Sequence, residues 1–161
     1  MPLLFALAVS IGLIAVPVIW SFLGPLAPFN LQIWQCFIAW GCFYHCGGGL
    51  TGVRTTVAGM TFGALVGAAV VFAAGYLGAL GVLAVPVAGA VGASAIVLAA
   101  HIGPLSTIPA SVYGFAAIAA LILLKGLAPL DAIVPTVAGI VLGAAIGWVS
   151  EFAGKRLAGA T

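Results

Sequence analysis

Charged side chains are very scarce in this sequence: six in 161 residues, four of them basic and two acidic. Soluble domains carry about a quarter of their residues as charged side chains, because their surface must face water. Apolar residues make up 65% of this chain, so its polar groups cannot cover a water-exposed surface. The sequence therefore predicts an all-α integral membrane protein whose surroundings are the lipid bilayer.

Glycine and proline residues divide the apolar sequence into six stretches. A helix needs about 20 apolar residues to cross the hydrocarbon core, so the chain accommodates about six transmembrane helices and no soluble module. We therefore expect a single transmembrane domain over residues 1–161. The net charge of +2 is too small for a nucleic-acid-binding surface. The six stretches are residues 3–23, 29–46, 50–76, 80–101, 105–124 and 130–152.

The basic residues favour one orientation in the membrane. If both termini are cytoplasmic, Arg54, Lys155 and Arg156 lie inside and Lys125 lies outside. This is the distribution that the positive-inside rule favours. The first stretch lacks a basic segment before it, so we expect an uncleaved first span rather than a signal peptide.

Glycines recur every four positions in the third and the sixth stretches. Residues four apart lie on one face of a helix, so these glycines predict smooth grooves in which helices approach closely. Such grooves hold helices together within one chain or between copies, and we expect a homo-oligomer. The packing glycines are Gly59, Gly63, Gly67, Gly139, Gly143 and Gly147.

The third and sixth stretches also resemble each other in sequence. Thr56–Gly67 aligns with Thr136–Gly147 at an offset of 80 residues, half the length of the chain. A duplication of three helices would give a 3+3 inverted repeat with halves 1–78 and 79–161, and such repeats place the solute path of transporters at their interface. The alternative is a recurring way of starting a helix, which is also present at Leu80 and Leu105. Both interpretations remain open.

Two segments combine polar side chains with glycine or proline. Polar groups inside a membrane are energetically expensive, which makes them the first functional candidates. Three consecutive glycines at 47–49 disfavour a helix, and backbone that opens within a membrane must be buried in protein or line a cavity. For the segment around these glycines, the alternative is an ordinary cytoplasmic turn. For residues 101–113, the alternative is that the polar side chains cap the helix and pack against neighbouring helices. We predict that a solute path is lined by Tyr44, His45, Gly48, Thr51, Arg54, His101, Ser106, Thr107, Pro109, Ser111 and Tyr113.

Catalysis and metal binding are disfavoured. Asp131 and Glu151 fall at expected membrane edges, so no carboxylate or nucleophile–base pair lies deep in a span. The histidines and cysteines lack zinc-type spacing, so we expect no metal and no cofactor. The absence of an acidic residue within a span also disfavours cation-coupled transport. It favours a passive path for a neutral or weakly ionised solute.

The two polar segments resemble motifs of a known family. Cys42–Gly52 and Thr107–Gly114 are similar to motifs of the YcdZ-like family of small bacterial inner-membrane proteins. In its members an aromatic-cysteine stretch leads into Gly-Gly-Leu-x-Gly, and a later motif contains a proline and a Thr or Ser before a glycine. Gly47 departs from the first pattern. The resemblance implies a six-helix protein of the bacterial inner membrane and a domain of unknown function.

These observations together predict a channel or facilitator rather than an enzyme. The expected solute is small and polar, such as urea, ammonia or a small organic molecule. The alternative is a membrane subunit that transports nothing and serves as an assembly or regulatory partner of a larger complex.

Overall fold

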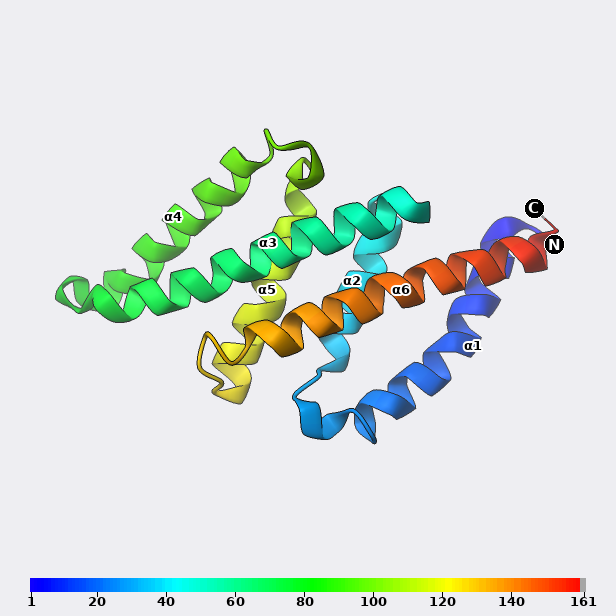
Figure 1. Cartoon of the computed structure of the whole chain (residues 1–161), viewed down its shortest axis with the longest axis horizontal. Helices are drawn as coiled ribbons and strands as arrows, with labels where there is room; N and C mark the ends of the chain where they lie inside the picture. Colours follow the sequence, from blue (N-terminus) through cyan, green and yellow to red (C-terminus); the bar gives the residue numbers. More distant parts are fainter. Residues whose placement is uncertain (160–161) are drawn as a thin grey trace.

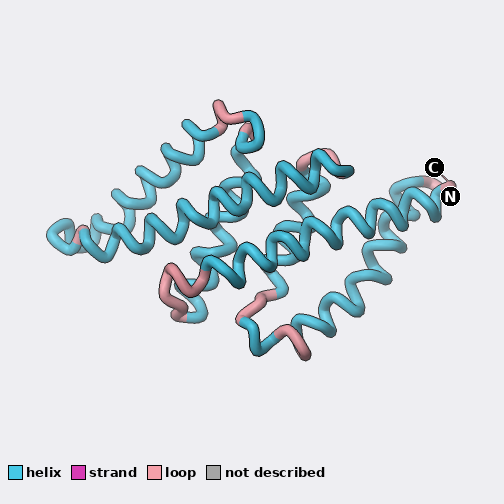
Figure 2. The backbone as a smooth tube through the Cα atoms, viewed as in Figure 1, coloured by secondary structure: helices cyan, strands magenta, loops and turns pink. Residues whose placement is uncertain are grey.

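Helices are the only regular secondary structure in the part of the chain that the computed structural model describes, residues 1–159. Over these residues it forms six α-helices, with 3₁₀ segments at Ala27–Phe29, Gly78–Leu83 and Gly103–Leu105 (Figure 1). Short loops complete the connections, as Figure 2 shows. The all-helical prediction is confirmed. The α-helices are α1 (Leu3–Leu23), α2 (Ile33–His45), α3 (Gly49–Tyr76), α4 (Ala84–Ala99), α5 (Ile108–Lys125) and α6 (Ile133–Ala158).

Helix lengths agree with a multi-pass membrane protein, with one exception. Within residues 1–159, five helical segments are long and apolar enough to cross a membrane. α2 has 13 residues, so it extends roughly 20 Å and falls short of a hydrocarbon core of about 30 Å. The expected stretch began at Phe29, but Phe29 ends a 3₁₀ turn and Asn30 follows it with a left-handed φ of 57°. The second helix therefore cannot span the core by itself.

The two halves of the chain are interleaved. α3 packs most extensively against α5, and α6 packs most extensively against α2. The first helix, α1, packs on α6, while α4 packs on α3. α3 and α6 also contact each other and run in opposite directions (Figure 1). The third helix of each half is thus held mainly by helices of the other half, which is the arrangement of an inverted pair.

The glycine contacts repeat between the halves. Corresponding glycines of α3 and α6 are 80 residues apart, and the residues they meet in α5 and α2 are 75 residues apart. These constant offsets favour a duplication of three helices over a sequence pattern that merely recurs at helix starts. A recurring start would not reproduce the same contacts between helices. The contacts are Gly59 to Ala110, Gly63 to Ser111 and Gly67 to Ile118, and in the other half Gly139 to Gln35, Gly143 to Cys36 and Gly147 to Phe43.

The core is built largely from small side chains, and the outer helices face outward. Alanines and glycines fill much of the space between the four central helices, together with larger buried residues such as Phe43, Met60 and Ile140. α1 and α4 lie on opposite edges of the molecule (Figure 1). They expose large apolar side chains such as Leu13 and Val91. An outward-facing apolar surface is what a lipid environment requires.

Candidate functional site

The glycine segment between α2 and α3 forms a closed corner. Gly47, Gly48 and Gly49 have φ values of 89°, 70° and 60°, which glycine adopts readily and other residues rarely do. The Gly47 amide donates to the Tyr44 carbonyl oxygen, and the Gly48 amide donates to the Phe43 carbonyl oxygen, both at 3.1 Å. The helix breaks at these glycines, but the amides bond within the protein rather than facing a cavity.

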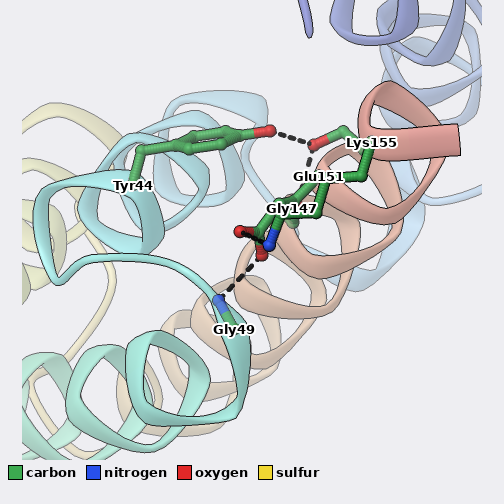
Figure 3. A network of polar contacts seen from close by, with 6 residues as sticks. Tyr44, Gly49, Gly147, Glu151 and Lys155 are labelled. Carbon is green, nitrogen blue, oxygen red and sulfur yellow. Dashed lines mark hydrogen bonds and ion pairs between the residues drawn. The ribbon is translucent and has the colours of Figure 1, made fainter. Parts of the chain in front are cut away.

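A carboxylate from α6 completes this corner. The Gly49 amide donates to Glu151 Oε2 at 2.7 Å, and Lys155 Nζ lies 2.7 Å from Glu151 Oε1 (Figure 3). The Glu151 side chain is 14% exposed, and a Cβ at Gly48 would lie 2.7 Å from its Oε1. The start of a helix favours a negative charge. At α3 the protein's own carboxylate already fills that position.

Glu151 was expected at a membrane edge and had no predicted role. Because α6 continues to Ala158, Glu151 lies inside the helix and reaches the start of α3. The signal that could have identified it is the spacing of Glu151 and Lys155, since residues four apart pair on one helix face.

Tyr44 contributes to a different contact, on α6 (Figure 3). Ser150 Oγ donates to the Gly147 carbonyl oxygen at 2.8 Å and accepts from Trp40 Nε1 at 2.9 Å. Because the Ser150 proton is already used, the Tyr44 hydroxyl is the donor in its 2.8 Å contact with Ser150 Oγ. Ser10 Oγ donates to the Ser150 carbonyl oxygen at 2.9 Å. This serine node joins α1, α2 and α6.

His45 faces an open pocket between α2 and α5, which we call the α2–α5 pocket. Its volume is about 440 Å³. The rings of His45 and Tyr113 meet there edge to face, with centroids 5.9 Å apart. One predicted residue from each polar segment is thus brought together. The pocket is lined by Phe37, Ile38, Gly41, Cys42, His45, Tyr113 and Ala116.

The α2–α5 pocket lies where the two halves meet and has few polar groups. Its polar side chains are a thiol, an imidazole and a phenol, and none of its lining residues is an acid, a lysine or an arginine. Ile38 and Tyr113 are 75 residues apart, as are Gly41 and Ala116. This is the offset that relates the partners of the packing glycines. Corresponding positions of the two halves therefore face the same pocket.

The other predicted path residues do not line this pocket. Ser111 is fully buried against Gly63, and its hydroxyl has no hydrogen-bond partner within residues 1–159. Thr107 precedes α5, but in the described structure its side chain makes no capping bond. Gly48 packs on Glu151, and Tyr44 belongs to the serine node. The exposed residues are Thr51, Arg54, His101, Ser106 and Pro109.

A second polar contact lies in the α2–α6 interface. Gln35 Nε2 donates to Thr136 Oγ1 at 2.8 Å, and both residues are fully buried. Neither was among the predicted site residues. Their signal in the sequence is a polar side chain inside an apolar helical stretch, which requires a partner in a neighbouring helix.

Comparison with known proteins places the chain in a family. Residues 8–155 match the model of a family described as "Protein of unknown function (DUF1097)". Neither a curated protein nor a solved structure matches the chain. The expected membership in a family of unknown function is therefore confirmed, and the narrower YcdZ-like resemblance stays a prediction.

Proposed function

Since the chain belongs to the DUF1097 family, which is described only as being of unknown function, we propose a function from its own site. The protein is a membrane channel or facilitator for a small neutral or weakly ionised polar solute, such as urea, ammonia or a small organic molecule. The α2–α5 pocket forms part of the path. The YcdZ-like resemblance supports a location in the bacterial inner membrane.

One observation carries the proposal: a pocket with neutral polar groups lies at the interface of two inverted halves. Inverted-repeat transporters bind their solutes at that interface. His45 and Tyr113 offer hydrogen bonds to a solute, while Phe37 and Ile38 provide apolar walls. Pockets that bind small molecules commonly combine apolar walls with a few polar groups.

The distribution of charge supports a neutral solute. The Glu151 carboxylate is engaged by the Gly49 amide and Lys155, so it does not reach the α2–α5 pocket. Arg54 is exposed on the first turns of α3 and does not line the pocket. A bare charge in a low-dielectric site is costly, and this pocket offers no opposite charge to compensate it.

Because the core of the helix bundle is closely packed, the proposed path runs along the outer α2–α5 face. Buried apolar side chains of α2, α3, α5 and α6 form a closely packed core. The α2–α5 pocket is open on its outer side, so a second copy placed over this face would enclose the solute. A homo-oligomer therefore belongs to the proposal, because it would supply the missing wall.

The basic residues support an orientation with both termini in the cytoplasm. The contact between Gly49 and Glu151 brings the start of α3 and the end of α6 together. Arg54, Lys155 and Arg156 therefore gather at one end of the molecule, whereas Lys125 ends α5. More basic residues at one end favour that end as the cytoplasmic side.

The test is solute flux into liposomes that contain the purified protein. Stopped-flow light scattering would follow urea, ammonia and glycerol, each compared with protein-free vesicles. Ala116→Trp fills the pocket from an exposed position and should reduce flux to the level of empty vesicles. Ala145→Trp, at an exposed position of α6 outside the pocket, is the matched control and should conduct normally. Equal flux in the two variants, or no flux with the unmodified protein, would refute the proposed path.

The packed core also supports the alternative, a subunit that transports nothing. Such a subunit needs outward apolar surface for a partner in the membrane, and α1 and α4 expose many large apolar side chains. Purification in a mild detergent distinguishes the two functions. A foreign protein that copurifies in fixed stoichiometry supports the subunit, and a homo-oligomer supports the channel.

A further inference from the structure

Three planar side chains form a row on α6, which we call the α6 stack: Trp148, Phe152 and Arg156. The rings of Trp148 and Phe152 are stacked, with centroids 6.1 Å apart and planes inclined by 19°. The guanidinium carbon of Arg156 lies 4.5 Å from the centroid of the Phe152 ring. Residues four apart share one helix face, and all three residues of this face are exposed. The stack therefore faces the surroundings of the chain.

The α6 stack lies in the last turns of a long helix. α6 has 26 residues, so it extends about 39 Å and exceeds a hydrocarbon core of about 30 Å. Arg156 belongs to its last turn, and Trp148 lies about 12 Å away along the helix axis. An arginine near a helix end reaches the lipid headgroups, and tryptophan is enriched where headgroups and acyl chains meet. The stack is therefore long enough to cross the interfacial layer of the membrane.

The charge of Arg156 is left for an external partner. Within residues 1–159, the only ion pair joins Lys155 to Glu151, at 2.7 Å. Arg156 lies against an aromatic ring instead, which orients the guanidinium while its N–H donors point outward from its edge. A guanidinium binds a phosphate group through two parallel hydrogen bonds. We infer that the α6 stack binds one anionic phospholipid, with Arg156 at the phosphate and the two rings along the glycerol and upper acyl chains.

The charges at this end of the molecule favour an anionic headgroup over a zwitterionic one. The chain has only two acidic residues. Asp131 precedes the opposite end of α6, and Glu151 is engaged by Lys155 and the Gly49 amide. The cation of a zwitterionic headgroup therefore meets no free carboxylate beside the stack. A headgroup with a net negative charge compensates Arg156 without introducing such a cation.

The lipid site is separate from the proposed solute path. None of the three residues of the α6 stack lines the α2–α5 pocket, which is formed by other helices. The inference therefore goes beyond the proposed transport function and does not require that the pocket conduct a solute. A protein that conducts nothing would still bind the lipid, so the two proposals can fail independently.

The test is native mass spectrometry of the full-length protein in detergent, titrated with phosphatidylglycerol and, separately, with phosphatidylcholine. The unmodified protein should retain one phosphatidylglycerol per chain and bind phosphatidylcholine more weakly. In Arg156→Gln the affinity for phosphatidylglycerol should fall about fivefold, the equivalent of about 1 kcal/mol for one basic residue near anionic lipid. Arg54→Gln is the matched control, because it removes an exposed arginine from the same end of the molecule but outside the stack. It should keep the original affinity.

Three results would overturn the site. Equal affinities of the unmodified protein for the two lipids would show that it does not select an anionic headgroup. Equal losses in Arg156→Gln and Arg54→Gln would show a general attraction between charges rather than a site at the stack. Displacement of the lipid by soluble glycerol phosphate would show a site for a free anion. Phe152→Leu keeps every charge and should also weaken binding, because the guanidinium loses the ring that orients it. Size-exclusion chromatography establishes that each variant is folded.

Discussion

The α2–α6 and α3–α5 interfaces share one backbone arrangement but differ in chemistry. In the first, Trp40 donates to Ser150, which also contacts α1. The positions that correspond to these two residues are Phe115 and Val70, and they pack around Gly92 of α4 without a hydrogen bond between side chains. The same helix crossing is therefore built once with a polar node and once with apolar contacts.

The second polar contact differs between the halves in the same way. Thr136 accepts a hydrogen bond from Gln35. At the corresponding position of α3, the Thr56 hydroxyl has no hydrogen-bond partner within residues 1–159, and Ala110 stands where the other half has the glutamine. The glycines are shared and the hydrogen bonds are not. The close approach of the backbones at the glycines therefore determines how the helices cross in both interfaces. The hydrogen bonds between side chains are an additional feature of the α2–α6 interface.

The largest effect should come from filling the shared glycine contacts. Gly63→Leu and Gly143→Leu would each force a side chain into the backbone of the facing helix, at Ser111 and Cys36. We expect each to lower the free energy of unfolding by about 3 kcal/mol or more, or to prevent folding. SDS titration in mixed micelles measures this, with Gly12→Leu, which has open space, as the control. A large loss at one glycine and none at its counterpart would contradict the equivalence of the two interfaces.

Removing the serine node should have the next largest effect. Ser150→Val introduces the residue type found at the corresponding position, but leaves the Trp40 N–H and the Tyr44 O–H without an acceptor. We expect a loss of about 2 kcal/mol. Adding Trp40→Phe and Tyr44→Phe removes both donors and should restore part of the stability. If the triple variant were no more stable than Ser150→Val in the same titration, unpaired donors would not explain the loss.

The two threonines should respond differently to the same change. Thr136→Val removes the 2.8 Å acceptor of the Gln35 amide, which then keeps only its 3.4 Å contact with the Ala117 carbonyl oxygen, and should cost about 1 kcal/mol. Thr56→Val removes a hydroxyl that has no partner, so it should leave the free energy of unfolding unchanged or slightly higher. Chemical unfolding of both variants side by side provides the measurement. Equal losses would show that the halves do not differ at this position.

The smallest effect should come from the carboxylate at the α2–α3 corner. Glu151→Gln keeps the shape but removes the charge that faces the Gly49 amide, at a cost of up to about 1 kcal/mol. Hydrogen exchange should accelerate at the first amides of α3 and stay constant at the start of α6, which lacks such a contact in the described residues. Lys155→Met, which leaves the carboxylate in place, should affect these amides less. Unchanged exchange in Glu151→Gln would rule out this role.

Features that repeat along the chain could be predicted from the sequence. Glycines at every fourth position indicated where helices approach, and Gly59 and Gly139 do lie against neighbouring helices. The number of helices followed from the punctuation by glycine and proline. The length of α2 did not, because Phe29 and Leu31 continue the apolar pattern whereas Asn30 between them adopts a left-handed conformation. A local backbone conformation outweighed the hydrophobic pattern there.

Features that depend on distant contacts could not be predicted. The Gly49 amide donates to a carboxylate 102 residues away in the sequence. The local sequence pattern does not show this partner, so it suggests that the backbone at this corner lacks hydrogen-bond partners. Tyr44 and His45 are adjacent and were expected to line one path. They point to α6 and to α5 respectively, because successive residues on a helix differ by about 100° in direction.

The interleaving of the halves has a consequence for biosynthesis. α1 is synthesised long before α6, yet α6 is its main partner. The groove of α3 is filled by α5, which also arrives later. The first three helices must therefore enter the bilayer before the helices that cover their packing faces are present. Neither half forms an independent folding unit. Truncation after α3 would leave a fragment that lacks the helices needed to assemble it.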